Sequence, residues 1–285
     1  MMDVQTLENL TIVAPLGLRF WDPVDATAIS EGLEVTIWPA GQPDVSTPAI
    51  PNRSGVFAFQ GLPGMREVEH GAGDDVFWAT HPPQRDFTVQ VQDLFGRFLP
   101  MQIPVRLPVR GLPDAIPLFS APARPLVSPM AVVRAQILDT VSNVPAAWVL
   151  VDANFDGGRT VRGMSDARGS LLLALPYPEA SSPGPRFGSP PPQGTKLADQ
   201  TWPVTLAFHY TPRQPVPTIP DMEQVLSQAP AEAWQDQGFT RPLTTAVLRF
   251  GRELILRTDA KVLSPPAPVQ PDLWITPAGS PPMTV

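Results

Sequence analysis

Short runs of alternating apolar and polar residues, separated by Gly, Pro, Asn or Asp, recur along the chain. In the clearest run, residues 87–93, Phe87, Val89 and Val91 share one parity and polar residues take the other. A period of two residues is typical of a strand with one buried face. The pattern predicts an all-β protein, with one short helix at residues 221–228 between two prolines.

Residues 97–107 have the pattern of a strand that returns after a turn at 93–96. Apolar residues take one parity of this strand, and Pro100, Pro104 and Pro108 all take the other. Because N–H groups of one parity point to the same side of a strand, these prolines remove donors along a single edge. We expect an edge strand protected against further pairing; a proline-rich ligand segment for an aromatic groove is the alternative.

Further strands are expected near the end of the chain. The pattern predicts a strand at residues 204–210 and a hairpin over 243–257 that turns at Gly251 and Arg252. Residues 273–275 would add an edge.

The order of sequence features occurs twice. In each copy an Asp ends a strand, a second strand region carries a Trp, and a turn ends in Gly. These residues are Asp22, Trp38 and Gly55 in the first copy, and Asp139, Trp148 and Gly169 in the second. The repeat predicts two tandem antiparallel β-sandwich domains covering residues 1–121 and 122–285, with the helix in the second. Prolines over 113–129 indicate a stiff connector, and residues 180–196 a Pro/Gly/Ser surface loop.

Composition narrows the classes of partner. The net charge is −7, and no cluster of Lys or Arg occurs, which argues against nucleic acid or an acidic membrane surface as a partner. Residues 1–10 carry Asp3 and Glu8 but no Lys or Arg, and no signal peptide or apolar anchor is recognisable. The chain has no Cys, which excludes disulfides and thiolate metal sites. We expect a cytoplasmic protein, which can also be part of a released or intracellular particle.

One segment resembles the opening of a calcium loop. Asp152, Asn154 and Asp156, followed by Gly157, place oxygen-bearing side chains at alternate positions. The twelfth position is Gly163 instead of Glu, and the same residue types are typical of a hairpin turn. A turn is therefore the preferred interpretation, with calcium as the alternative.

A second group of metal-binding residue types lies within residues 67–81. Its members are Glu67, Glu69, His70, Asp74, Asp75 and His81. They lack a regular helix or strand spacing that would aim them at one point, so an acidic, solvated loop is expected.

Catalytic chemistry has little support in the sequence. The chain has three histidines, and neither a nucleophile elbow nor a glycine-rich phosphate loop occurs. His209 is expected on the solvent face of a strand. We therefore expect no enzyme activity, no catalytic residues and no cofactor.

Seven tryptophans are spread along the chain. They can form stacking platforms for sugars, as in a carbohydrate-binding module, but tryptophans on strands usually fill sandwich cores or interfaces. A polar groove beside exposed tryptophans would favour the first interpretation.

The second copy resembles the carboxypeptidase regulatory-like family of the transthyretin (prealbumin) superfold. The resemblance rests on Asp139-Thr140, Pro145-Ala146, Ser165-Asp166-Ala167 and Gly169. It implies a non-catalytic sandwich module, so both β-sandwich domains are expected to be transthyretin-like or immunoglobulin-like. Residues 87–100 and 272–277 also resemble accessory proteins of phage-tail-like contractile injection systems.

These observations lead to one functional expectation. The chain would be a structural or adaptor protein that contributes interfaces to a multiprotein assembly, such as a contractile particle, at its cap, sheath end or baseplate. Other structural proteins would be its partners, with homo-oligomers arising from assembly symmetry. The alternative is a carbohydrate or cell-surface binding module.

Overall fold

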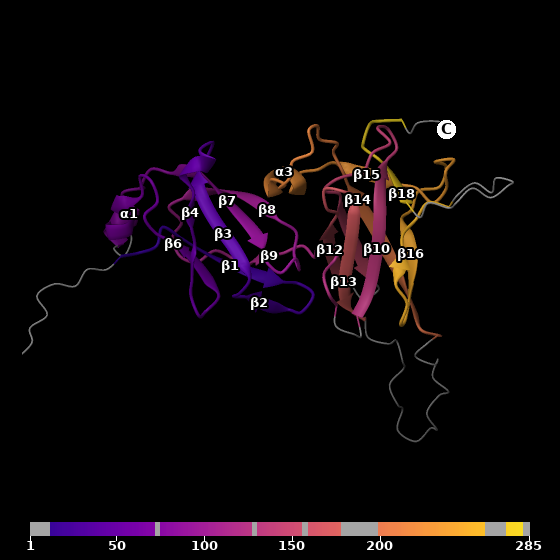
Figure 1. Ribbon diagram of the computed structural model, residues 1–285, viewed down its shortest axis with the longest axis horizontal. Helices are drawn as coiled ribbons and strands as arrows, with labels where there is room; N and C mark the ends of the chain where they lie inside the picture. The colour runs from indigo at the N-terminus through magenta and orange to yellow at the C-terminus, as the bar shows by residue number, and fades with distance from the viewer. Residues whose placement is uncertain are drawn as a thin grey trace, which may run out of the picture. The chain divides into compact units, whose positions relative to one another are not determined.

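The computed structural model describes residues 12–71, 75–126, 130–155, 159–177, 199–259 and 272–281, and the chain is mostly β (Figure 1). It divides into two compact units. The first comprises Met1–Asp22, Ala26–Phe95 and Pro100–Leu118, and the second comprises Pro23–Asp25, Gly96–Leu99 and Phe119–Val285. The predicted all-β class with antiparallel sheets is confirmed.

The first unit contains two sheets. One has the order β2-β1-β6-β5, with β9 also paired to β1, and the other has the order β4-β3-β7-β8. The bounds in the first sheet are β1 (Leu16–Asp22), β2 (Thr27–Ile29), β5 (Ile50–Pro51), β6 (Val56–Phe59) and β9 (Ile116–Pro117). Those in the second are β3 (Leu33–Pro39), β4 (Thr47–Pro48), β7 (Arg85–Asp93) and β8 (Met101–Leu107), and a 3-10 turn, η1 (Pro43–Val45), precedes β4.

The period-two pattern explains how this unit buries its core. Phe87, Val89 and Val91 on β7 are all buried, and β7 pairs along its length with β3 and β8. β8 ends the sheet order, which confirms the predicted edge strand. Pro104 lies opposite Thr88 of β7. Since proline has no N–H, it fits a position whose nitrogen faces away from β7.

The strands of the second unit pair in the order β12-β11-β14-β15-β18-β10-β13, and β16 also pairs with β14 and β17 with β10. A bridge between Ser165 and Leu171 also brings β12 and β13 together. The bounds are β10 (Met130–Asp139), β11 (Leu150–Phe155), β12 (Arg159–Met164), β13 (Ser170–Pro176), β14 (Thr201–His209), β15 (Pro230–Ala233), β16 (Thr245–Arg249), β17 (Leu254–Ile255) and β18 (Asp272–Thr276).

A continuous hydrophobic core fills the second unit. Val133 and Ile137 of β10 are fully buried and pack in the same cluster as Val204 of β14 and Phe155 of β11. β15 pairs with both β14 and β18, so it joins the strands around β10 to those around β14. Inward-facing residues of both groups therefore share one core, as in a sandwich.

Strand pairing repeats the order seen in the sequence. In each unit the first strand pairs antiparallel with the strand after the Gly turn, β1 with β6 and β10 with β13. It also pairs parallel with later strands, β9 in the first unit and β17 and β18 in the second. In the other group, β3 pairs with β4 and β7 as β11 pairs with β12 and β14. The internal repeat therefore extends beyond the residues that revealed it.

Helix α3 (Met222–Leu226) confirms the predicted helix of the second unit. It begins after the N-cap Asp221, whose side chain accepts a hydrogen bond from the backbone N–H of Glu223 at 2.9 Å. Met222 and Val225 are buried on one face. An N-cap and apolar residues three apart are the usual local requirements for such a helix.

Two helices, α1 (Arg66–Gly71) and α2 (Asp75–Ala79), occupy the described part of residues 66–79, so the predicted acidic loop is wrong. Met65 and Val68 are three residues apart, and both are buried. Their burial anchors one face of α1, while Glu67 remains exposed. The high density of acidic residues concealed this short apolar spacing.

The predicted hairpin over 243–257 is also wrong. The turn at Gly251 does form, with the Arg252 N–H donating to the Arg249 carbonyl at 3.2 Å. However, β16 pairs with β14, whereas β17 pairs with β10. Leu248 and Leu256 are both buried, so the chain crosses between the two groups of strands and buries apolar residues in each.

β18 is an inner strand instead of the predicted edge. It lies between β15 and β10, and Leu273 and Ile275 are fully buried. The expected loop at 180–196 lies outside the described residues. Among the residues that are described, no helix has the length and apolar character needed to cross a membrane.

Candidate functional site

The residues that carry the family resemblance hold turns in the second unit. Asp139 is buried at the end of β10, and its carboxylate accepts hydrogen bonds from the Val141 N–H and the Ser142 hydroxyl, both at 2.8 Å. The Tyr210 hydroxyl donates to the same carboxylate at 3.4 Å. Burial, together with the negative charge of Asp139 and this hydrogen bond, raises the pKa of Tyr210 above its ordinary value.

Ser165 is the buried serine of the same motif. Its hydroxyl accepts a hydrogen bond from the Val149 N–H at 2.9 Å and donates to the Ala146 carbonyl at 3.1 Å. The hydroxyl therefore ties the start of β11 to the end of β12. No histidine or carboxylate takes part in these contacts, so the geometry is that of a structural hydroxyl.

The Gly turns of the two units have the same hydrogen bonds. In the second unit one Asp166 carboxylate oxygen accepts from the Arg168 and Ser170 N–H groups, both at 2.8 Å. In the first unit the Asn52 side-chain oxygen accepts from the Ser54 and Val56 N–H groups, both at 2.9 Å. Gly55 and Gly169 both have positive φ, 73° and 76°. The repeated motif is therefore a turn that starts the following strand.

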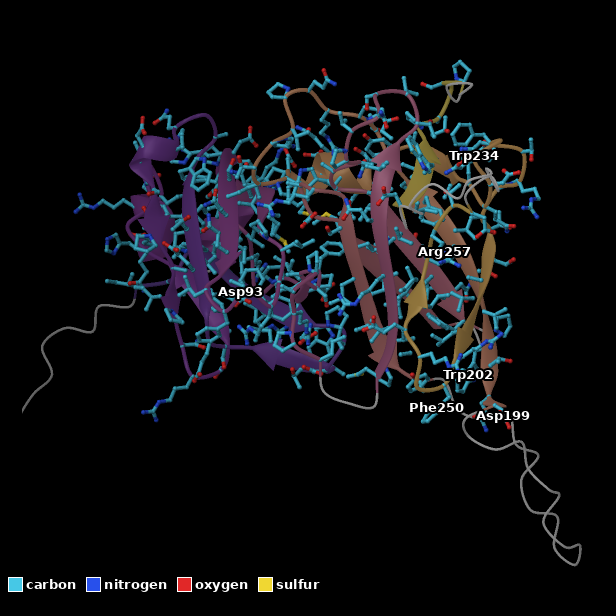
Figure 2. All side chains as sticks on the ribbon, turned by 45° about the vertical axis from the view of Figure 1, so that its right-hand side comes forward. Asp93, Asp199, Trp202, Trp234, Phe250 and Arg257 are labelled. Atoms are coloured by element: carbon cyan, nitrogen blue, oxygen red, sulfur yellow. The ribbon has the colours of Figure 1, made fainter. Side chains whose placement is uncertain are left out.

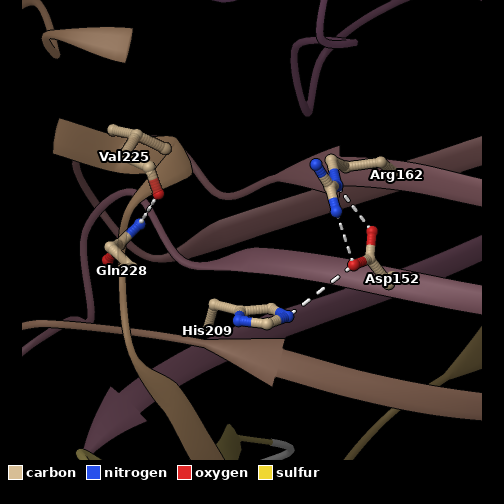
Figure 3. A network of polar contacts seen from close by, with 5 residues as sticks. All are labelled: Asp152, Arg162, His209, Val225 and Gln228. Atoms are coloured by element: carbon tan, nitrogen blue, oxygen red, sulfur yellow. Dashed lines mark hydrogen bonds and ion pairs between the residues drawn. The ribbon is translucent and has the colours of Figure 1, made fainter. Parts of the chain in front are cut away.

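A polar cluster lies on the outward face of β11, β12 and β14 (Figure 3). Arg162 donates two hydrogen bonds to Asp152, at 2.6 and 2.8 Å, and these bonds raise the pKa of Arg162. His209 Nε2 lies 3.7 Å from Asp152 Oδ2. Burial alternates along β14, and His209 has the opposite parity to the buried Phe208, which confirms the predicted solvent face. The cluster is a cross-strand ion pair flanked by an imidazole.

The calcium candidates do not form a loop over their described part. Asp152 and Asn154 lie on β11, and their side chains point away from the core, while Asp156 lies outside the described residues. Because Arg162 engages both oxygens of Asp152, a cation would have to displace a guanidinium. Asp152 and Asn154 therefore belong to a strand, and not to the turn that was the preferred interpretation.

The second candidate metal group is divided among separate contacts. Glu69 accepts a hydrogen bond from the Gly61 N–H, and Asp75 pairs with Arg110. Asp74 lies outside the described residues. In the part of the chain that is described, no group of three or more His, Asp or Glu residues has the geometry of a metal site.

Gln228 links α3 to the sandwich (Figure 3). Its buried amide donates to the carbonyls of Trp148 and Val225, at 2.9 and 3.0 Å, and its oxygen accepts from the Thr211 N–H at 2.9 Å. All three partners are backbone groups. Gln228 therefore positions the helix against the strand regions around Trp148 and Tyr210.

Most tryptophans are packing residues. Trp38, Trp148, Trp202 and Trp234 are buried, and Trp21 is 37% exposed. The Trp148 indole donates to the Pro217 carbonyl, and the Trp234 indole to the Thr276 hydroxyl. Trp202 belongs to the core cluster of the second unit, and burial of all four is typical of packing tryptophans.

The second unit has a groove of about 620 Å³ that no sequence pattern revealed. Three arginines, two aromatic rings and one carboxylate contribute to its lining: Arg124, Arg134, Arg252, Tyr177, Phe250 and Glu253. The Tyr177 ring packs against Phe250 and Trp202, and Figure 2 labels the latter two. Arg252 lies 118 residues after Arg134 in the sequence, so only the tertiary structure brings it beside Arg124 and Arg134.

A second groove, of about 520 Å³, lies within the first unit. Trp78, Val68 and Leu112 line it together with small residues of β1 and β6. The ion pair of Asp75 and Arg110 also contributes to the lining. In this groove a tryptophan, Trp78, therefore lies beside a charged pair.

Comparisons with known proteins add little. No family model matches the chain, and no curated protein matches it. The solved structure entitled "The Bacillus anthracis TIE protein" is similar over 88% of this chain, at 11% sequence identity and a TM-score of 0.22. This chain spans 34% of that chain's length. A likeness at this TM-score carries no argument.

Proposed function

We propose that the chain is a non-catalytic structural or adaptor protein that supplies interfaces to a multiprotein assembly. The observation that carries this proposal is how its polar motif residues are used. Asp139, Ser165 and Asp166 are all engaged in closing turns, and Asp152 is engaged by a guanidinium. They stabilise the sandwich and leave its surface for binding.

Exposed apolar side chains support an interface role. Leu94, at the turn after β7, is 67% exposed, and Val247 on β16 and Ile255 on β17 are each 55% exposed. Leu94 lies at a turn, and β16 and β17 lie outside the main sheet order, each paired with one strand of it. Side chains of this type are suited to burial against a partner protein.

A more specific proposal names the family of the second unit and the kind of assembly to which the chain belongs. The turn contacts of Asp139 and Asp166 support a carboxypeptidase regulatory-like module of the transthyretin superfold in the second unit. Together with the resemblance of residues 87–100, this supports a place in a phage-tail-like contractile particle. The partners would be other structural proteins of that particle.

Sedimentation of a lysate of the native host tests the proposal. The pellet from ultracentrifugation is analysed by mass spectrometry for this chain together with sheath and tube proteins. Co-sedimentation in a defined particle supports the proposal. A chain that stays in the supernatant as a monomer overturns it, and carbohydrate binding then becomes the function to test.

A further inference from the structure

The groove of the second unit collects positive charge in an acidic protein. Arg124 pairs with Asp25 at 3.0 Å, and Arg134 with Glu253 at 3.4 Å. Arg252 is exposed, and the structure gives it no ion pair among the described residues. Three guanidinium groups therefore meet two carboxylates, in a chain whose net charge is −7.

Hydrogen bonds hold two of the residues that line the groove, Tyr177 and Arg134. The Tyr177 hydroxyl accepts a hydrogen bond from the Gly251 N–H at 2.9 Å, which holds the turn that carries Arg252. Arg134 also donates to the Pro122 carbonyl at 2.9 Å. Met130 and Val132 add apolar surface beside the arginines. A preformed groove with apolar walls and one unbalanced cation suits an acidic, apolar segment of polypeptide.

Residues 1–11 of this chain have that chemistry. The segment has two acidic residues, Asp3 and Glu8, and no Lys or Arg. Five of its residues are apolar: Met1, Met2, Val4, Leu7 and Leu10. Its acidic and apolar residues thus match the cationic and apolar lining of the groove. The segment belongs to the first unit, and the groove to the second.

We infer that residues 1–11 of one copy dock into the groove lined by Arg134, Arg252 and Tyr177 of a second copy. This inference rests on the proposed function, because it supplies one of the interfaces of the assembly. The two surfaces differ, so the contact is heterologous and joins copies head to tail. Such contacts extend into a filament unless the rotation between copies closes a ring.

Cysteine cross-linking tests the contact, because the chain has no Cys of its own. Full-length Leu7→Cys is mixed with full-length Met130→Cys and treated with a short bismaleimide. The expected product is a covalent dimer in which mass spectrometry finds position 7 joined to position 130. The control replaces Met130→Cys by Thr205→Cys, an exposed position on β14 outside the groove, and we expect about tenfold less product from it.

Charge reversal is the second readout. Arg252→Glu in the Met130→Cys chain should lower the dimer yield about tenfold. Arg168→Glu, which reverses an exposed arginine on another turn, should leave the yield unchanged. Equal yields from positions 130 and 205, or no effect of Arg252→Glu, would overturn the inference.

A single chain that carries both Leu7→Cys and Met130→Cys tests separately whether the segment docks within its own copy or into another copy. A cross-linked product of monomer size from this chain, with no dimer from the mixed single variants, would also overturn it. Neither result would change the co-sedimentation test, so failure of this contact is distinguishable from failure of the proposed function.

Discussion

Individual residues in the repeated turn determine how the strand after it starts, β6 in the first unit and β13 in the second. Asn52 and Asp166 accept the same pair of backbone hydrogen bonds, and Gly55 and Gly169 have the same left-handed backbone. The surroundings of the two glycines differ. A Cβ at Gly169 would lie 2.4 Å from the Ile137 carbonyl oxygen, whereas at Gly55 the nearest atom is 3.7 Å away.

Alanine at these two glycines should therefore have unequal effects. Gly55→Ala places an alanine in the left-handed region, and we expect a loss of about 1–2 kcal/mol in unfolding free energy. Gly169→Ala adds a clash with backbone, so we expect a loss of about 3 kcal/mol or more. Urea denaturation of both variants measures the difference, and equal losses would contradict the role of the Ile137 carbonyl.

Calcium should not stabilise the protein. Both oxygens of Asp152 are engaged by Arg162, so a cation gains little unless it displaces that ion pair. We expect the same melting temperature with excess calcium as with a chelator, because a ligand that binds the native state would raise it. A clear rise that Asp152→Asn abolishes would instead identify Asp152, Asn154 and Asp156 as ligands.

Among the elements, α3 is held to the second unit partly by one buried polar side chain, Gln228, beside the buried Met222 and Val225. Gln228→Ala removes a buried amide that bonds to Trp148, Val225 and Thr211. It leaves the Thr211 N–H and the Trp148 carbonyl without this partner, so we expect a loss of about 2–4 kcal/mol in unfolding free energy. Gln224→Ala, at an exposed position of the same helix, is the control and should cost less than about 1 kcal/mol.

Elements were predictable where the signal is local. Alternation revealed β7 and β8, and the proline parity revealed that β8 is an edge, because both features depend on neighbouring residues. The pairing of β16, β17 and β18 was predicted wrongly. A strand that follows a turn can join either group of strands, and burial of Leu248 and Leu256 in a shared core makes that choice. Information of that kind is not in the local pattern.

At the scale of the whole molecule, the candidate site was also predictable only where its signal is local. The sequence located Asp152 and His209 but not their meeting, because β11 and β14 are paired over a long sequence separation. The groove was not predictable, since Arg124, Arg134 and Arg252 each have the sequence signature of an ordinary surface residue. The internal repeat was predictable, because its turns require Asn or Asp at the start and Gly at the end.

The last prediction concerns the stability of the second unit at alkaline pH. Tyr210 is buried, and burial together with the charge of Asp139 raises the pKa of Tyr210 above its ordinary value of 10.0. In the unfolded chain the tyrosine ionises near pH 10, whereas the folded protein keeps its proton to a higher pH. The unfolded state then binds fewer protons, so the unfolding free energy should fall as pH rises above about 10.

The chain offers a matched control for this prediction, because it has two tyrosines. Tyr210→Phe cannot ionise, so its unfolding free energy should fall less steeply between about pH 10 and 11 than that of the wild type. Tyr177→Phe should retain the wild-type slope, since it leaves Tyr210 beside Asp139. Urea denaturation at intervals from about pH 8 to 11 provides the comparison. Equal slopes for Tyr210→Phe and the wild type would show that the Tyr210 proton does not contribute to this dependence.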